Sequence, residues 1–167
     1  MQSPSYIRSF ALYTKCGFIL REPLFLMQGQ PLKCDNNRSA RLVLDDNDIS
    51  MCNELCKSAY GFSRDLELHQ AIDQGVALMT EQDGAVTGYA AGIGILCHAV
   101  AKSNDDLKTL IANASTILGP GFLVPGRNHE IINWLLENRF QIGWPANLMT
   151  IGPYQEPRLP FLPSLAY

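Results

Sequence analysis

The chain has 167 residues, of which 47% are hydrophobic and 17% charged, and its formal net charge is −3. This balance is typical of one globular domain, or of one domain with an appendage, that can bury a sizeable core. The thirteen Lys and Arg residues are scattered, which argues against a nucleic-acid partner, because such a surface needs clustered positive charge. The longest apolar run, residues 89–101, is too short to span a bilayer, and the N-terminus lacks the apolar block of a signal peptide. We therefore expect a cytoplasmic protein without a membrane partner.

The five cysteines are an odd number without a C-x-x-C pair. This pattern favours reduced thiols in the cytoplasm over a disulfide framework. Cys52 and Cys56 lie one helical turn apart, so they are either two metal ligands or two small buried residues on one helix face. His69, His98 and His129 show no metal-ligand spacing, and we predict no metal.

The first 29 residues are predicted to form a helix and an extended segment. Ser3-Pro4 has the pattern of an N-cap followed by proline at the first helical position, and the helical face stops at Gly17. Residues 18–28 are apolar and predicted to be extended. Residues 30–40 are polar and without periodicity, which predicts a linker.

A second unit, over residues 41–152, is predicted to combine short strands with amphipathic helices, and a proline-rich extended arm packed on the surface follows it at 153–167. Asp83-Gly84 is a strong hairpin signal within this unit. The helices surround a mostly antiparallel, mixed sheet, so the predicted fold class is α+β. The predicted elements are a strand at 41–44, helices at 45–59 and 64–73, strands at 75–81, 85–91 and 93–100, a helix at 103–118, a strand at 122–124, a helix at 128–136 and a strand-like stretch at 140–151.

Two stretches of the chain match at identical spacing, and each follows a helix-like stretch. The matching residues are Phe18, Pro23, Leu26 and Met27 in the first copy and Phe140, Pro145, Leu148 and Met149 in the second. Such a repeat suggests two related domains, of which this chain holds one whole copy and the tail of the other.

Residues 10–28, FALYTKCGFILREPLFLMQ, resemble the closing helix and strand of GNAT-family acetyltransferases. That family often carries the pattern Ala-x-x-Leu-Tyr-x-x-x-Gly-Phe there, and Leu12-Tyr13 and Gly17-Phe18 match its core. The order of elements from 41 to 151 also resembles one complete GNAT domain. The resemblance implies the C-terminal part of a tandem GNAT protein. Its predicted parts are the end of a preceding domain at 1–29, a linker at 30–40, a GNAT-like domain at 41–152 and an arm at 153–167.

The resemblance implies acetyl transfer from acetyl-CoA to an amine, with Tyr13 as the general acid that protonates the coenzyme A thiolate. The alternative for Tyr13 is a tyrosine of an amphipathic helix with its hydroxyl at the rim. When the two copies are aligned, Leu135 and Arg139 stand at the positions of Tyr13 and Gly17. The second copy therefore lacks the general-acid tyrosine.

The family holds the cofactor's pyrophosphate in a glycine-containing loop between the central strand and the next helix. The residues at that junction that could contact acetyl-CoA are His98, Val100, Lys102 and Ser103. The junction has no glycine, and two aspartates in the first helical turn would repel an anion. Acetyl-CoA is thus a possible cofactor that the local sequence disfavours. The alternative for His98 is a hydrogen-bonded histidine of the core.

Arg127, Asn128 and His129 lie at another predicted helix N-terminus, where they either bind an anion or substrate or form a polar cap. The predicted function is a GNAT-like acetyltransferase domain with weak or absent activity as this chain alone, acting on a small-molecule substrate. The alternative is a non-catalytic module on the same fold that binds a small ligand or dimerises. The apolar segment 1–29 is predicted to pair with the sheet of the complete unit or to exchange strands in a homodimer.

Overall fold

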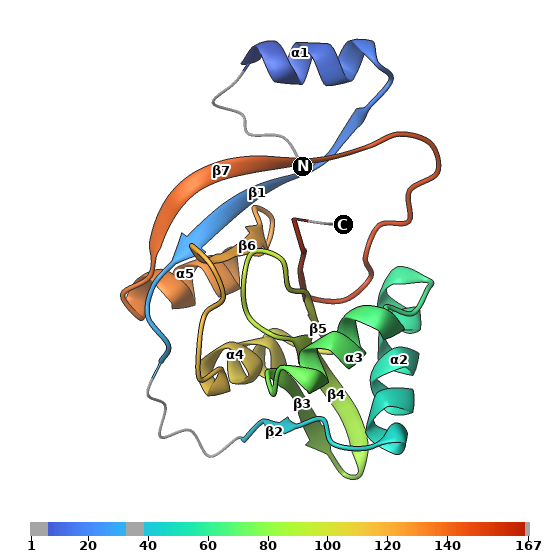
Figure 1. The fold of residues 1–167 in the computed structure, drawn as a ribbon. Helices are drawn as coiled ribbons and strands as arrows, with labels where there is room; N and C mark the ends of the chain where they lie inside the picture. Colours follow the sequence, from blue (N-terminus) through green and yellow to red (C-terminus); the bar gives the residue numbers. More distant parts are fainter. Residues whose placement is uncertain (1–6, 33–38, 166–167) are drawn as a thin grey trace.

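The structure is a computed structural model and describes residues 7–32 and 39–165, so that the predicted cap at Ser3-Pro4 lies outside it. Within these residues the strands form two antiparallel sheets, of order β6–β1–β7 and β2–β3–β4–β5–β8, flanked by helices (Figure 1). The predicted α+β class is confirmed. The elements are α1 (Ile7–Lys15), β1 (Ile19–Gln28), β2 (Arg41–Leu42), α2 (Asp46–Tyr60), α3 (Asp65–Asp73), β3 (Ala77–Gln82), β4 (Ala85–Ala91), β5 (Ala99–Ala101), α4 (Asn104–Asn113), β6 (Phe122–Pro125), α5 (His129–Glu137), β7 (Gln141–Thr150) and β8 (Phe161–Leu162).

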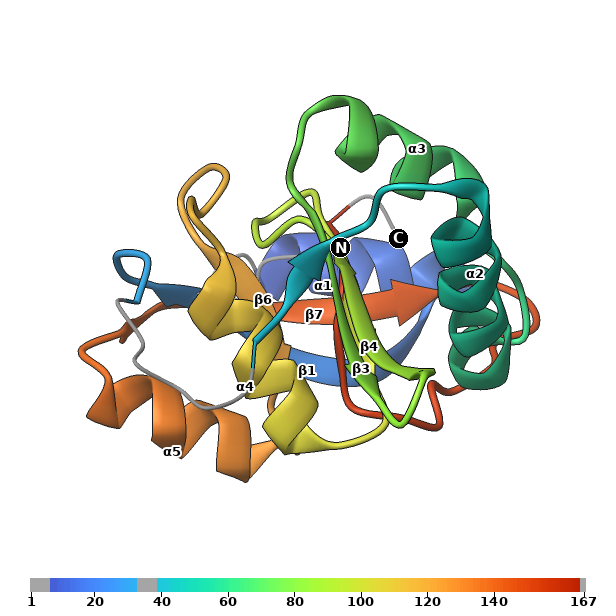
Figure 2. The ribbon, with the colours of Figure 1, turned by 90° about the horizontal axis from the view of Figure 1, so that it is seen from below.

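The central strands of the five-stranded sheet, β3, β4 and β5, pack against other elements on both faces. Side chains alternate between the faces along each strand, so that cross-strand partners share a face. Leu78 and its partner Ala90 pack against α4 in one core cluster. Met79, Tyr89 and Val100 pack against α2 and α3 in a second cluster. Figure 2 shows α2 and α4 on opposite sides of this sheet.

Local signals position these elements. The Asp45 side chain accepts from the Asp48 N–H at the start of α2, and the Ser103 side chain accepts from the Asp106 N–H at the start of α4. Both caps satisfy helix N–H groups that have no partner within the helix. The β3–β4 hairpin turns at Asp83-Gly84, where the φ angles are +53° and +76°. Two consecutive positive φ angles match the right-handed twist of a hairpin.

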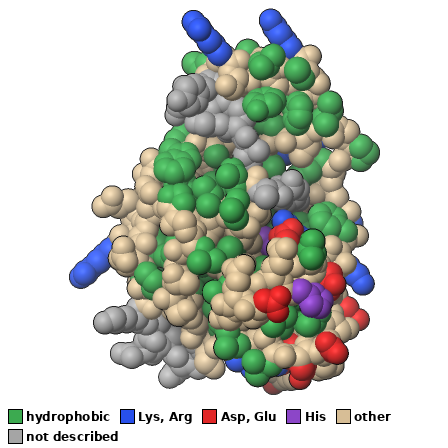
Figure 3. Space-filling view, in the orientation of Figure 1, with side chains coloured by type: hydrophobic (Ala, Val, Ile, Leu, Met, Phe, Trp, Pro, Cys, Tyr) green, Lys and Arg blue, Asp and Glu red, His purple; other side chains and the backbone are tan. Residues whose placement is uncertain are grey.

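The N-terminal strand β1 lies in the middle of the three-stranded sheet, between β6 and β7. Leu24, Leu26 and Met27 are fully buried there. The segment thus pairs with strands of the unit that follows it, within one chain. Helix α1 projects from the other elements and has no buried residue (Figure 1). Hydrophobic side chains gather on the upper part of the surface in Figure 3, where α1 and the ends of β1 and β7 lie.

Two predicted elements are shorter than expected. The strand predicted at 93–100 is wrong, because Gly92 adopts a φ of +83° and the chain turns back, so that β5 begins only at Ala99. The helix predicted to reach residue 118 ends at Asn113. Leu118 belongs instead to a loop, where its N–H donates to the Ile93 carbonyl. In the sequence, Leu118 continues the apolar spacing of the helix, but in the structure its backbone forms an isolated β-bridge with Gly94.

The C-terminal arm is not confined to the surface, which corrects that expectation. Strand β8 pairs antiparallel with β5, and Phe161 and Leu162 are only 2% and 3% exposed. Phe161 joins the cluster under α2 and α3, whereas Leu162 joins the cluster under α4. The arm therefore contributes to both cores.

Candidate functional site

Strands β5 and β6 belong to different sheets, and we name the space between them, which residues 157–165 fill, the groove. The chain segments that lead into these strands lie side by side at a parallel bridge between Gly94 and Leu118, after which the strands belong to different sheets. The C-terminal segment, residues 157–165, lies between them and contacts both strands. The Ala101 N–H donates to the Pro160 carbonyl over 3.0 Å, and the Leu165 N–H donates to the Ile95 carbonyl over 2.8 Å. The chain thus fills this groove with its own backbone.

The predicted cofactor contacts are spread over different surroundings. Val100 is fully buried on the face under α2 and α3. Lys102 is exposed, and its N–H donates to the Thr87 carbonyl. Ser103 caps α4, and its hydroxyl donates to the Asp106 carboxylate over 2.6 Å. Only Lys102 and Ser103 of this set therefore lie where a ligand at the α4 N-terminus could reach them.

The N-termini of α4 and α5 lie together at one end of the groove. The Asn128 amide donates to the Asn104 side-chain oxygen over 2.9 Å, and the Asn128 oxygen caps α5. His129 is exposed. Arg127 contacts Glu22 of β1 over 3.3 Å, forms an ion pair with Glu156, and lies over the Phe161 ring. The charge of Arg127 is therefore shared between two carboxylates of the chain itself.

These residues do not fit acetyl-CoA held by its pyrophosphate. Asp105 and Asp106 occupy the first turn of α4, and Glu130 reaches the same helix through Asn104 and Lys108. Carboxylates at a helix N-terminus occupy the place of an anion and repel a second one. An extended cofactor arm in the groove would also overlap the C-terminal segment.

Tyr13, the predicted general acid, is 39% exposed on α1. Its ring makes an edge contact with Phe18, with 5.4 Å between the ring centroids. In Figure 1, α1 lies at the top of the molecule and α4 in its lower half. The structure thus separates Tyr13 from the residues at the helix N-termini.

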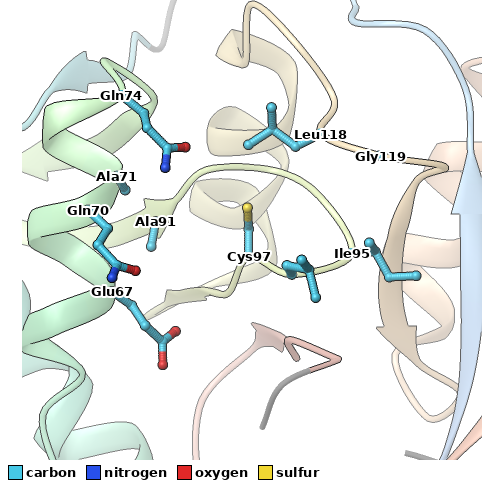
Figure 4. A pocket seen from close by; sticks show the side chains of 10 residues that line it. Glu67, Gln70, Ala71, Gln74, Ala91, Ile95, Cys97, Leu118 and Gly119 are labelled. Carbon is cyan, nitrogen blue, oxygen red and sulfur yellow. The ribbon is translucent and has the colours of Figure 1, made fainter.

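A second site is a pocket of about 340 Å³ beside α3, which we name the α3 pocket. One helix face lines it, with Glu67, Gln70, Ala71 and Gln74 at successive helical spacings. The loop of residues 95–97 forms the opposite wall. Figure 4 shows the glutamine amides, the Glu67 carboxylate and the Cys97 thiol around the same space. The pocket combines polar groups on one side with an apolar wall on the other, as small-molecule sites do.

Buried groups hold the Glu67 carboxylate at the edge of this pocket. His98 is fully buried, and its Nδ1 lies 3.0 Å from Glu67 Oε2, while its Nε2 lies 2.8 Å from the Tyr89 hydroxyl. Arg64 donates to Glu67 over 2.8 Å and 3.0 Å. A neutral imidazole with its proton on Nδ1 satisfies both of its contacts. His98 is thus a hydrogen-bonded core residue that also orients Glu67.

The pKa shifts agree with this arrangement. Burial lowers the pKa of His98 below its ordinary value, although the bond to Glu67 opposes the shift. Burial raises the pKa of Glu67, but hydrogen bonds from His98 and Arg64 outweigh it and leave this pKa below its ordinary value. Burial raises the pKa of Cys97. At neutral pH the pocket therefore presents a carboxylate and a thiol, and the buried imidazole that holds the carboxylate is neutral.

Glu67, Gln70 and Gln74 were not predicted from the sequence as site residues. Their spacing on one helix face is readable from the sequence, but a polar face is also typical of any helix exposed to solvent. Among residues 7–32 and 39–165, no three His, Cys, Asp or Glu side chains converge as metal ligands would. The same described ranges hold no helix that is long and apolar enough to cross a membrane.

No protein-family model matches the sequence, and no curated protein matches it. Its fold is similar to the crystal structure of "a putative acetyltransferase" from Pyrococcus horikoshii, with a TM-score of 0.68 and 16% sequence identity. The match covers 89% of this chain and 52% of that one, so this chain spans about half the length of that protein. This likeness shows a fold of the acetyltransferase type.

Proposed function

We propose that this chain is a GNAT-like acetyltransferase domain that transfers acetyl groups weakly or not at all and binds a small polar molecule in the α3 pocket. The likeness in fold supports the first part. The observation that carries the proposal is the C-terminal segment in the groove between β5 and β6, where it pairs with β5 and buries Phe161 and Leu162. A donor cofactor would have to displace this segment from beside β5.

The α3 pocket supports a ligand with hydrogen-bond donors, such as a small primary amine with an apolar body. Glu67 is fixed by Arg64 and His98 before any ligand arrives, which lowers the entropic cost of binding. The amides of Gln70 and Gln74 add donors and acceptors on the same face. The wall formed by residues 95–97 accommodates the apolar part.

A second candidate function is active N-acetyl transfer, which one observation favours. Residues 95–97 line the α3 pocket, while Ile95 and Leu96 also accept hydrogen bonds from the C-terminal segment. The groove and the pocket thus lie on either side of one stretch of backbone. An acetyl donor in the groove and an amine in the pocket would be brought together there, with Glu67 placed to accept a proton. This function requires the C-terminal segment to leave the groove.

The wider organisation is also a proposal. Residues 1–29 would be the end of a preceding related domain, residues 41–152 the GNAT-like domain and residues 153–167 its arm. The pairing of β1 with both β6 and β7 supports a close association of two such domains, because the first would supply the central strand of the second. A cytoplasmic location and a homodimer stay predictions.

Thermal unfolding with acetyl-CoA tests the proposal against the second candidate. Ligand at a hundred times its dissociation constant stabilises a protein by about 2.7 kcal/mol. We expect no change in the midpoint for the full chain at millimolar acetyl-CoA. A saturable increase, together with acetylation of a primary amine, would replace the proposal with the second candidate.

The pocket is tested with benzylamine as the probe, by NMR titration of the full chain. We expect saturable shifts of the amides in α3 and in residues 95–97, and we expect Glu67→Gln to abolish them. Glu54→Gln, on the exposed face of α2, is the matched control and should leave them unchanged. Equal shifts in both variants would exclude specific binding at Glu67.

A further inference from the structure

We propose that the groove between β5 and β6 is a binding site for an extended peptide, and that the C-terminal segment is its built-in, replaceable ligand. The inference rests on the proposed function to the extent that acetyl-CoA does not occupy the groove. It adds the class of ligand that occupies the groove, which is a polyamide chain with an aromatic residue followed by an aliphatic one.

Backbone pairing supplies the first part of the recognition. The Ala101 N–H donates to the Pro160 carbonyl, and the Leu165 N–H donates to the Ile95 carbonyl. The Ser164 hydroxyl donates to the Leu96 carbonyl over 3.0 Å. The first bond belongs to β5 and the other two to the turn that precedes it. The segment runs antiparallel to β5, as a peptide does when it adds a strand to an exposed sheet edge. Any extended chain of similar length offers the same backbone groups.

Alternate side chains supply the second part. Phe161 points to the face under α2, where the Tyr60 ring meets it edge-on at 6.0 Å between centroids. The Arg127 guanidinium lies 5.9 Å from the centroid of the same Phe161 ring. Leu162 points to the opposite face and packs in the cluster under α4. The groove therefore selects an aromatic side chain on one face and an aliphatic one on the other.

The connection to the rest of the chain makes the segment replaceable. Residues 151–153, 155 and 156 are exposed, and β8 itself has only two residues. Gly152, with a φ of +78°, has open space where a side chain would point. Short ladders and exposed connections are features of the least stable parts of a protein. We therefore expect the segment to open before β1, which pairs on both sides, and its opening exposes Phe161 and Leu162 of the two cores.

The test uses the full chain with a protease site inserted between Gly152 and Pro153. After cleavage, the nicked protein keeps its own segment by non-covalent contacts. The probe is a fluorescein-labelled synthetic peptide of residues 153–167, followed by fluorescence anisotropy. We expect saturable exchange of the labelled peptide into the folded, nicked protein.

Two variant peptides sharpen the test. A peptide with Phe161→Ala should bind about a hundredfold more weakly, because it loses a buried aromatic side chain. A peptide with Arg158→Ala is the matched control and should bind within about threefold of the original, because that side chain is exposed. Equal binding of all three peptides would overturn the proposed selectivity. Unfolding on cleavage, or the lack of any exchange by a folded nicked protein, would overturn the proposal itself.

Hydrogen exchange of the intact chain gives a second measurement. The Ala101 amide donates to the segment, and the Leu165 amide belongs to the segment and donates to Ile95. Both amides should exchange at least about tenfold faster than the amides of β1. Equal protection would show a permanent strand and overturn the proposal. Displacement of the labelled peptide by acetyl-CoA would contradict the proposed function but would support the groove as a site for extended ligands. A failure of the proposed function can thus be told apart from a failure of the peptide site.

Discussion

The N-terminal strand β1 and the C-terminal strand β8 both lie among strands of the unit that separates them in the sequence, but they are held very differently. Strand β1 has ten residues and pairs on both sides, with β6 and with β7. Strand β8 has two residues and pairs on one side, with β5. Each β1 residue in the middle of the ladder therefore depends on two neighbouring strands, whereas β8 depends on one.

The comparison shows that the burial of a terminal segment does not by itself make it permanent. Leu24 and Leu26 of β1 are fully buried, and Phe161 and Leu162 of β8 are nearly as buried. The two segments differ in backbone pairing and in the length of the ladder. Non-local pairing must offset the entropy of closing a long loop, and a ten-residue strand does so far better than a two-residue strand.

Removing β1 should have the largest effect. A chain that starts at Ser39 loses the central strand of the three-stranded sheet and exposes the unpaired edges of β6 and β7. We expect loss of cooperative thermal unfolding and aggregation during size-exclusion chromatography. Removal of residues 1–15 alone is the control, since α1 has no buried residue, and it should change the free energy of unfolding by less than about 1 kcal/mol. A soluble monomer that starts at Ser39 would contradict the role given to β1.

The next effect comes from the aromatic residue of β8. Phe161→Ala should lower the free energy of unfolding by about 3–5 kcal/mol in urea denaturation, because a buried aromatic side chain is replaced by a cavity. Leu165→Ala, at a position that is 41% exposed, is the control and should cost less than about 1 kcal/mol. Equal, small costs would mean that β8 contributes little to either core.

Arg127 links the two terminal segments, through Glu22 of β1 and Glu156 before β8. Arg127→Gln should cost about 1–2 kcal/mol, mainly because the buried Glu22 loses its charged partner. Glu156→Gln should cost less than about 0.5 kcal/mol, since that carboxylate is exposed. Denaturant unfolding of both variants measures the two costs. A larger cost for Glu156→Gln than for Arg127→Gln would mean that the ion pair with Glu156 stabilises the fold more than the ion pair with Glu22.

Acid should weaken the β8 side through His98, which precedes β5. Burial lowers the pKa of His98 below its ordinary 6.5, so the unfolded chain takes up its proton first as the pH falls. The stability from neutral His98 is therefore present above about pH 6.5 and is lost as the pH falls through the lower pKa of the folded state. His98→Gln should flatten the decline in unfolding free energy below about pH 6.5. His69→Gln should not flatten it, because the pKa of exposed His69 is raised by Asp65 and its effect has the opposite sign.

Local signals made much of the fold predictable. The hairpin at Asp83-Gly84 and the caps at Asp45 and Ser103 involve residues that are near in sequence, so their patterns are readable without a partner. Strand β8 was not predictable, because its two residues lie between prolines and become a strand only through β5. The α3 pocket was missed for a similar reason. Glu67 looks like any exposed helix residue until the fold places His98 behind it.

The smallest expected effect concerns Tyr13, and it tests the role that the resemblance to the GNAT family implies. Tyr13 is 39% exposed, and its edge contact with Phe18 does not need the hydroxyl. Tyr13→Phe should therefore change the free energy of unfolding by less than about 0.5 kcal/mol in urea denaturation. If the chain alone transferred acetyl groups with Tyr13 as the acid, the same variant would lower that rate at unchanged stability. Because α1 lies far from the α4 N-terminus, we expect neither property to change (Figure 1).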